Sequence, residues 1–246
     1  MSAEVITALS GLVEAVAWPI IFLLLLLTQR RRISALIASI ETLTLPGGVK
    51  ASFRRELEQE ARSAGVDREA AKLPPSPELI DAANRIDEAS LDYDFDVVRQ
   101  EAKALAREYE RFRTEMTPGS PRTRRMEVVI SKMRTLGLAM WPLLDEFAAS
   151  NSPGERLAAI ATLQLRPDTS RLDWLAERLS VEKPFVAYHA AMALLVAVRT
   201  LGQEYKPQLV KALGTAANAI EALPQDADRT TTIRTAQQEL ERRFPA

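Results

Sequence analysis

Three arginines, Arg122, Arg124 and Arg125, stand close together at the predicted start of a helix. The N-terminus of a helix attracts anions, because its free N–H groups and the positive end of its dipole face outward. This spacing therefore predicts an anion-, nucleotide- or partner-binding site. The alternative, which we favour, is that these arginines pair with acids of the preceding helix such as Glu108 or Glu115.

Three aspartates alternate along the next candidate site: Asp92, Asp94 and Asp96. Alternating carboxylates suit a hard cation such as Ca²⁺, which prefers several oxygen ligands. The segment lacks the glycine and the distal glutamate of an EF-hand loop, so we expect no metal site here. We interpret it as a loop that ends in a helix cap, with acids near the positive helix end.

The chain has one histidine, His189, and no cysteine. Disulfides, thiol nucleophiles, zinc sites built on cysteine and histidine-cluster metal sites are therefore excluded. A catalytic histidine needs a nucleophile and an orienting acid, and no motif supplies either. We expect His189 to be a structural residue bonded inside a helical stack. No P-loop, dinucleotide fingerprint, nucleophile elbow or metal signature is present, so we predict a non-enzyme without cofactor.

The segment Val5–Thr28 is almost entirely apolar and is followed by Arg30, Arg31 and Arg32. About 20 apolar residues cross the ~30 Å hydrocarbon core of a bilayer, so this segment predicts a transmembrane helix. It lacks the basic start and the small-residue cleavage site of a signal peptide, which favours a permanent anchor. The arginines should stay on the cytoplasmic side, with the N-terminus outside, in a single-pass protein of the inner (plasma) membrane.

Two residues inside the predicted anchor could carry function: Glu14 and Pro19. An ionisable group in hydrocarbon is costly, so Glu14 should face water, a partner or the headgroups. It would form a ring of carboxylates in an oligomeric bundle or pore, or lie near the interface if the anchor starts later. Pro19 removes a backbone donor, and a kink is expected there.

The stretch after the anchor is a connector. Four apolar residues at helical spacing predict an amphipathic segment at the membrane surface: Ile33, Leu36, Ile37 and Ile40. In Leu43–Phe53, two short alternating stretches flank Pro46-Gly47-Gly48, which predicts a tight β-hairpin. Phe53–Ala64 should form a charged helix that Gly65 caps. This arrangement, an arginine-flanked anchor followed by a GG-V-x-A-x-F element, resembles many bacterial single-span membrane proteins.

A proline-rich linker, Lys72–Pro77, marks the predicted domain boundary. Beyond it, Ser76 should cap a helix over residues 77–90. The next helix carries apolar residues at heptad spacing: Phe95, Val98, Ala102, Leu105, Tyr109, Phe112 and Met116. This stripe is typical of a coiled coil between protomers or of a helix packed in its own domain, and we favour the second. A further helix buries five residues on one face: Met126, Val129, Ile130, Met133 and Leu136.

From Trp141 onward the chain is repetitive. Aligning Pro153 with Pro184 matches Ala159 with Ala190 and Leu163 with Leu194. Second helices are expected over 172–179 and 207–223. The pattern resembles HEAT-like repeats, whose first helix carries P-x-x-R-x-x-A-x-x-x-L, and the resemblance implies stacked helix pairs. Arg156 fits that motif, and Ala187 departs from it. The helix over 184–200 should be the buried centre, and the last helix, over 228–244, should cap the final repeat.

The sequence thus predicts an all-α protein, rich in Ala, Leu, Glu and Arg, with a transmembrane helix, a juxtamembrane β-hairpin and a HEAT-like domain. Its expected parts are an anchor (1–32), a connector (33–76) and a helical domain (77–246). The net charge of −1 indicates no nucleic-acid partner. We expect a membrane-anchored scaffold or sensor that contacts the bilayer and a cytoplasmic protein. The alternative is a homo-oligomerising, pore-forming or membrane-disrupting effector of bacterial defence or cell suicide.

Overall fold

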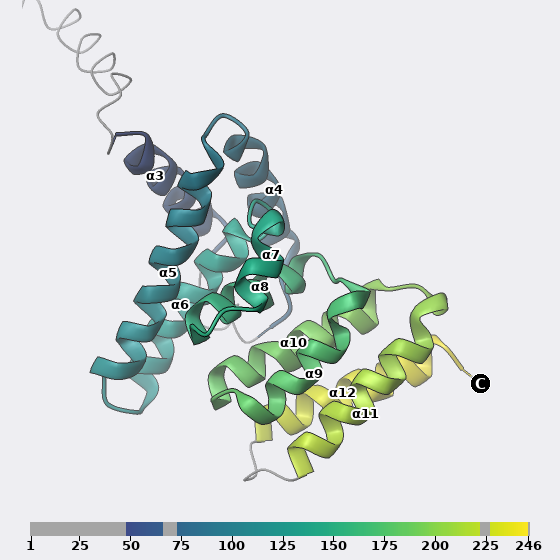
Figure 1. Ribbon diagram of the computed structural model, residues 1–246. Helices are drawn as coiled ribbons and strands as arrows, with labels where there is room; N and C mark the ends of the chain where they lie inside the picture. Colours follow the sequence, from purple (N-terminus) through teal and green to yellow (C-terminus); the bar gives the residue numbers. More distant parts are fainter. Residues whose placement is uncertain (1–47, 66–72, 222–226, 246) are drawn as a thin grey trace, which may run out of the picture. The chain divides into compact units, whose positions relative to one another are not determined.

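The computed structural model describes residues 48–65, 73–221 and 227–245, and these residues are helical apart from short turns (Figure 1). The all-α prediction is therefore confirmed for this part of the chain, and Lys50–Ala246 form one compact unit. The α-helices are α3 (Gly48–Ser63), α4 (Pro77–Ser90), α5 (Phe95–Glu115), α6 (Ser120–Leu136), α7 (Leu144–Ala148), α8 (Pro153–Leu165), α9 (Leu172–Val181), α10 (Pro184–Thr200), α11 (Lys206–Glu221) and α12 (Ala227–Arg243). Three short 3₁₀ turns precede α7, α9 and α11: η2 (Trp141–Leu143), η3 (Thr169–Arg171) and η4 (Gln203–Tyr205).

The predicted anchor lies outside the described residues. This applies to the candidate residues Glu14 and Pro19, to the flank Arg30–Arg32 and to the amphipathic segment that follows it. Among the helices described here, none combines the length and the apolarity needed to cross a bilayer.

The predicted β-hairpin is wrong over residues 48–53, which form the first turns of α3. The buried residues of α3 are Phe53, Leu57 and Ala61, each one helical turn from the next. This stripe packs against the rest of the domain, and Phe53 lies 5.0 Å from Tyr93 between ring centroids. Burial of one helical face explains why residues 48–53 are helical and not strand. The helix ends as predicted at Gly65, whose φ of 61° favours glycine.

Both helix starts predicted around the aspartate segment are confirmed. Ser76 caps α4, because its Oγ accepts a hydrogen bond from Leu79 N at 3.3 Å, and Pro77 occupies the first helical position. Asp94 caps α5, because its Oδ1 accepts from Asp96 N at 2.9 Å. Within the described ranges no group of three or more His, Asp or Glu side chains is placed to hold a metal ion.

Helix α5 forms the centre of the N-terminal half and packs against both α6 and α8. Its heptad stripe is buried in the middle, at Val98, Ala102, Leu105 and Tyr109, while Phe95 at its start is 37% exposed. Packing within its own domain, the favoured interpretation, is therefore confirmed. The predicted face of α6 is buried as well, and α4 packs across it.

The C-terminal half is built from helix pairs at the predicted positions. Helices α8 and α10 begin at Pro153 and Pro184, and each is followed by its partner, α9 or α11. Neighbouring pairs stack, because α8 packs on α10 and α9 packs on α11. Figure 1 shows α9, α10, α11 and α12 running side by side. We call α8–α12 the helical stack.

Helix α10 is the buried centre of the helical stack, as predicted. It contacts α8, α9, α11 and α12, and its buried residues lie all around its circumference. The small side chains of Ala187, Ala190, Ala193 and Ala197 are inaccessible to solvent, so that neighbouring helices can approach closely. Helix α12 covers α10 and α11 with Ile233, Ala236 and Leu240 and leaves most of its polar residues exposed.

Candidate functional site

A cavity of about 260 Å³ lies where α5 ends and where α6, α10 and α12 begin. We call it the His189 cavity. Six of its lining residues carry the chemistry discussed below: Arg113, Arg122, Thr123, Phe185, Tyr188 and His189. The turn between α5 and α6 positions the two arginines, because Gly119 adopts a φ of 150° that side chains disfavour.

Of the three arginines predicted as a site, Arg122 lines this cavity. Its Nη1 donates to the backbone carbonyl oxygens of Arg113 and Met116, both at 3.4 Å, so that it helps to close the C-terminus of α5. Its Nε is buried and has no hydrogen-bond partner. A buried donor without an acceptor costs about 1–3 kcal/mol, which a ligand or an ordered water can recover.

Arg124 and Arg125 do not line the cavity, and both are exposed. The Arg125 guanidinium lies 5.9 Å from the ring centroid of Phe112. We had favoured pairing of the three arginines with Glu108 or Glu115. Among the described residues, however, none of the three arginines forms an ion pair. The three arginines, which are close together in the sequence, therefore do not share one site: Arg122 lines the cavity, and Arg124 and Arg125 lie outside it.

His189 lies at the back of the cavity and is 1% exposed. Its ring contacts Phe185 edge-on at 4.7 Å and Tyr188 at 5.2 Å between centroids. Burial, assisted by the charge of Arg134, holds the pKa of His189 well below its usual value, so the ring is neutral near pH 7. The predicted burial is confirmed, but the predicted bonding is incomplete, because Nδ1 has no hydrogen-bond partner.

A buried polar chain fixes α10 behind the cavity. Arg134, which is inaccessible to solvent, donates from Nε to Gln164 Oε1 at 2.6 Å. Gln164 in turn donates from Nε2 to the backbone carbonyl oxygen of His189 at 2.7 Å. Burial lowers the pKa of Arg134 to about 10, which still leaves the guanidinium charged near pH 7. Helices α6, α8 and α10 are thus joined by side-chain hydrogen bonds inside the core.

The remaining polar lining is acidic. Glu127 and Asp228 contribute carboxylates to the same cavity that Arg113 and Arg122 line. Phe185 forms part of the wall and stacks on Tyr109 of α5 at 5.7 Å between ring centroids. The cavity therefore combines cations, anions and aromatic faces. This set is suited to non-covalent binding of a small polar molecule that carries both kinds of group.

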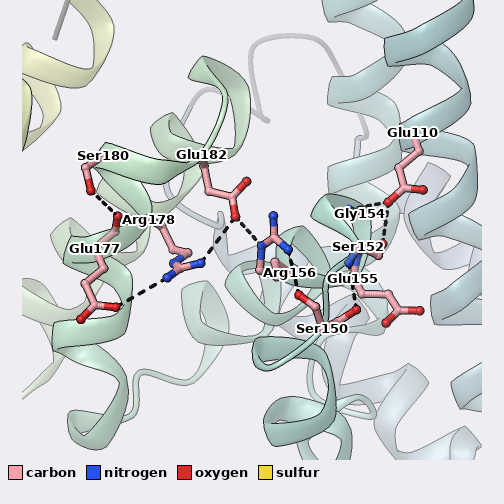
Figure 2. A network of polar contacts seen from close by, with 10 residues as sticks. All are labelled: Glu110, Ser150, Ser152, Gly154, Glu155, Arg156, Glu177, Arg178, Ser180 and Glu182. Atoms are coloured by element: carbon pink, nitrogen blue, oxygen red, sulfur yellow. Dashed lines mark hydrogen bonds and ion pairs between the residues drawn. The ribbon is translucent and has the colours of Figure 1, made fainter.

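A polar network anchors the helix starts next to this cavity (Figure 2). Glu182, at the end of α9, accepts a hydrogen bond from Arg156 Nε within an ion pair, and Arg178 Nη1 lies 3.7 Å from the same oxygen. Arg156 also donates from Nη1 to the backbone oxygen of Ser150 at 2.8 Å. Arg156 thus joins the start of α8 to the turn that leads into α10, and so to Phe185.

The other end of the network ties α8 to α5. Ser152 caps α8, because its Oγ accepts from Glu155 N at 3.0 Å and donates to Glu110 Oε1 at 2.5 Å. Gly154 N donates to the same Glu110 oxygen at 3.1 Å (Figure 2). A Cβ at Gly154 would collide with the backbone carbonyl of Ala106, so the two helices meet backbone to backbone at this point.

Comparisons of the chain with protein-family models, with curated proteins and with solved structures found no match. Function is therefore argued from the residues themselves. Sequence reasoning identified Arg122 and His189 separately but missed that Arg113, Phe185 and Asp228 share a cavity with them. A signal for this cavity was present in the sequence: Pro121 and Pro184 mark two helix starts, and charged and aromatic residues lie next to them.

Proposed function

We propose that this protein is a membrane-anchored, non-enzymatic interaction scaffold or sensor whose HEAT-like helical domain faces the cytoplasm. The observation that carries the proposal is the helical stack, in which α8/α9 and α10/α11 form consecutive pairs. Stacked helix pairs present extended surfaces that other proteins bind. The apolar segment Val5–Thr28 and the arginines after it support the anchor and its orientation.

The surface that we assign to a partner protein is the exposed side of α9 and α11. Val181, the last residue of α9, is 64% exposed, and Val210, near the start of α11, is 52% exposed. Lys211 of α11 forms an exposed ion pair with Asp173 of α9.

Site-specific photo-crosslinking of the full-length chain in its native cells tests this assignment. A crosslinker at Val181 or Val210 should give one product of defined mass, and Val210→Glu should abolish the product formed from position 181. Leu91, which is 83% exposed in the turn after α4, is the control position and should give no such product. Equal products from all three positions, or none from 181 and 210, would contradict the scaffold function.

Membrane attachment has its own test, the fractionation of cells that produce the full-length chain. The chain should sediment with membranes and should be released by detergent but not by alkaline carbonate. Replacement of Leu24 and Leu25 by arginine should release it, because charge in mid-membrane costs about 2.5–3.5 kcal/mol per residue. Recovery of the unaltered chain in the aqueous fraction would overturn the anchor.

The second candidate function is an oligomerising membrane effector of bacterial defence or cell suicide. The observation that favours it is Glu14, an ionisable residue within an apolar segment that also contains Pro19. Overproduction of the wild-type chain should then permeabilise cells, and Glu14→Leu should relieve the effect. Equal harmlessness of the two chains would remove this candidate.

A further inference from the structure

The first observation behind a new binding site is the cationic side of the His189 cavity. Arg113 and Arg122 approach it from the end of α5 and the start of α6, and α10 begins beside them. Helices α6 and α10 each have 17 residues, and neither has a side-chain hydrogen bond at its N-cap. Two positive helix ends and two guanidinium groups therefore favour an anionic group in this part of the cavity.

The second observation is the aromatic wall. Phe185 and Tyr188 line the cavity and are half-buried, and His189 lies edge-on to both rings behind them. Tyr109 supports Phe185 from α5. Rings fixed in this way offer a rigid apolar surface for a planar group at little entropic cost.

The third observation is that hydrogen-bonding groups other than cations also line the cavity. The carboxylates of Glu127 and Asp228 and the hydroxyl of Thr123 belong to the lining. His189 adds Nδ1, a buried ring nitrogen that has no partner within the protein. Carboxylates disfavour a simple inorganic anion, but they accept hydrogen bonds from amino and hydroxyl groups. A ligand that matches the unpartnered Nδ1 of His189 carries a hydrogen-bonding group at some distance from its anionic group.

The size of the cavity further limits the kind of ligand that it can bind. Its volume of about 260 Å³ lies just below the ~300–1,000 Å³ of pockets for drug-sized ligands. A mononucleotide approaches this size, whereas a dinucleotide or a polymer would extend well beyond the cavity.

From these observations we propose that the His189 cavity binds a nucleoside monophosphate. Arg113 and Arg122 hold its phosphate, the base lies against Phe185 and Tyr188, and the amino and hydroxyl groups of base and sugar reach Asp228, Glu127 and His189. This site goes beyond the scaffold function and does not depend on it. The bound nucleotide would join α5, α6, α10 and α12, the four elements that meet at the cavity.

The single histidine of the chain provides a direct readout. The full-length protein, carrying an affinity tag without histidine, is studied in detergent micelles by NMR of the His189 imidazole. Adenosine, guanosine, cytidine and uridine 5′-monophosphates are titrated in turn, beside the unphosphorylated nucleosides and inorganic phosphate. At least one monophosphate should shift the His189 signal saturably and bind at least about tenfold more tightly than its nucleoside or phosphate alone, because the charge-assisted hydrogen bonds of its phosphate add to the contacts of its base.

A matched pair of variants tests the assigned residues. Arg122→Gln should weaken binding by about tenfold or more, and Arg124→Gln, two residues along the same helix but outside the cavity, should leave it within about twofold. Because Arg122 also closes α5, Phe185→Leu provides a second variant, which should weaken binding without touching the backbone contacts of Arg122. Thermal unfolding of each variant establishes that it is folded.

Each other outcome counts against the site. Equal binding of inorganic phosphate and of the best monophosphate would reduce it to an adventitious anion site and overturn the nucleotide assignment. Equal effects of Arg122→Gln and Arg124→Gln, or no change in the His189 signal with any nucleotide, would also overturn it. Failure of the membrane or crosslinking experiments would leave this result unaffected, so the two proposals stand or fall separately.

Discussion

The side-chain amide of Gln164 donates to the backbone carbonyl oxygen of His189 at 2.7 Å, which joins α8 to the centre of α10. The same amide accepts from Arg134 Nε at 2.6 Å, so one uncharged side chain serves a buried guanidinium and a buried backbone oxygen. Gln164 is 1% exposed. The position of the His189 cavity relative to α6 thus depends on a residue that does not line it.

Gln164→Leu should lower the free energy of unfolding by about 2–4 kcal/mol, because it removes hydrogen bonds from groups that stay buried. Chemical unfolding followed by tryptophan fluorescence measures the change. The double variant Arg134→Met/Gln164→Leu should recover part of the loss, since removing both polar partners costs less than stranding one. A double variant that is less stable than either single one would contradict the role assigned to this pair.

Gly154→Ala should destabilise the domain by about 1–3 kcal/mol, because the new methyl group meets the backbone of Ala106 and must push α8 away from α5. Gly214→Ala is the matched control in α11, where a Cβ has no atom within 4 Å. That substitution should stabilise the protein by about 0.5–1 kcal/mol through better helix propensity. Thermal unfolding should therefore show a lower melting temperature for Gly154→Ala and a higher one for Gly214→Ala. Equal changes in the two melting temperatures would argue against a backbone contact at Gly154.

Arg156→Met should cost roughly 2–4 kcal/mol, because it leaves the Glu182 carboxylate, 3% exposed, with Arg178 alone. The comparison is Arg199→Met, which breaks the pair between Arg199 and Glu239 on the surface. Because the Arg199 side chain is 42% exposed, that loss should stay below about 1 kcal/mol. Denaturant midpoints of the two variants give the difference, and a smaller effect for Arg156→Met would show that the network in Figure 2 is not structural.

Stability should fall as the pH is lowered from about 7 to about 5. The pKa of His189 is well below its ordinary value in the folded protein, so below about pH 6.5 the unfolded chain takes up a proton that the native state does not. The titration of His189 changes the free energy of unfolding by at most about 1.4 kcal/mol per pH unit. The variant His189→Gln should lose this pH dependence. Carboxylates with lowered pKa, such as Glu146 and Glu239, lose their contribution only at lower pH, so a slope that persists unchanged in His189→Gln would assign the effect to other groups.

The helices were largely predictable from local signals. Pro77, Pro153 and Pro184 each begin a helix, and Ser76 and Asp94 each cap one, because these residues act on the first turn alone. The start of α3 was not predictable in this way. The residues Pro46-Gly47-Gly48 are typical of a turn, whereas the burial of Phe53, Leu57 and Ala61 depends on elements distant in sequence. A local pattern does not show which face of a segment the rest of the chain covers.

The candidate site was predictable only in parts. Arg122 stood out by its place at a helix start and His189 as the single histidine, but their shared cavity follows from how α6 and α10 pack. The expected partners of Arg122 were carboxylates on α5, whereas the observed ones are the backbone oxygens of Arg113 and Met116. Spacing along a helix indicates which side chains can meet, and the end of a neighbouring helix competes for them with its free carbonyl groups.

The contact between Gly154 and Ala106 also decides how the two halves of the domain can move. Where two backbones touch without side chains between them, one helix cannot slide along the other without a loss of van der Waals contact. The contact therefore fixes the position of α8 along α5, so that any rearrangement between these two helices has to take place away from Ala106.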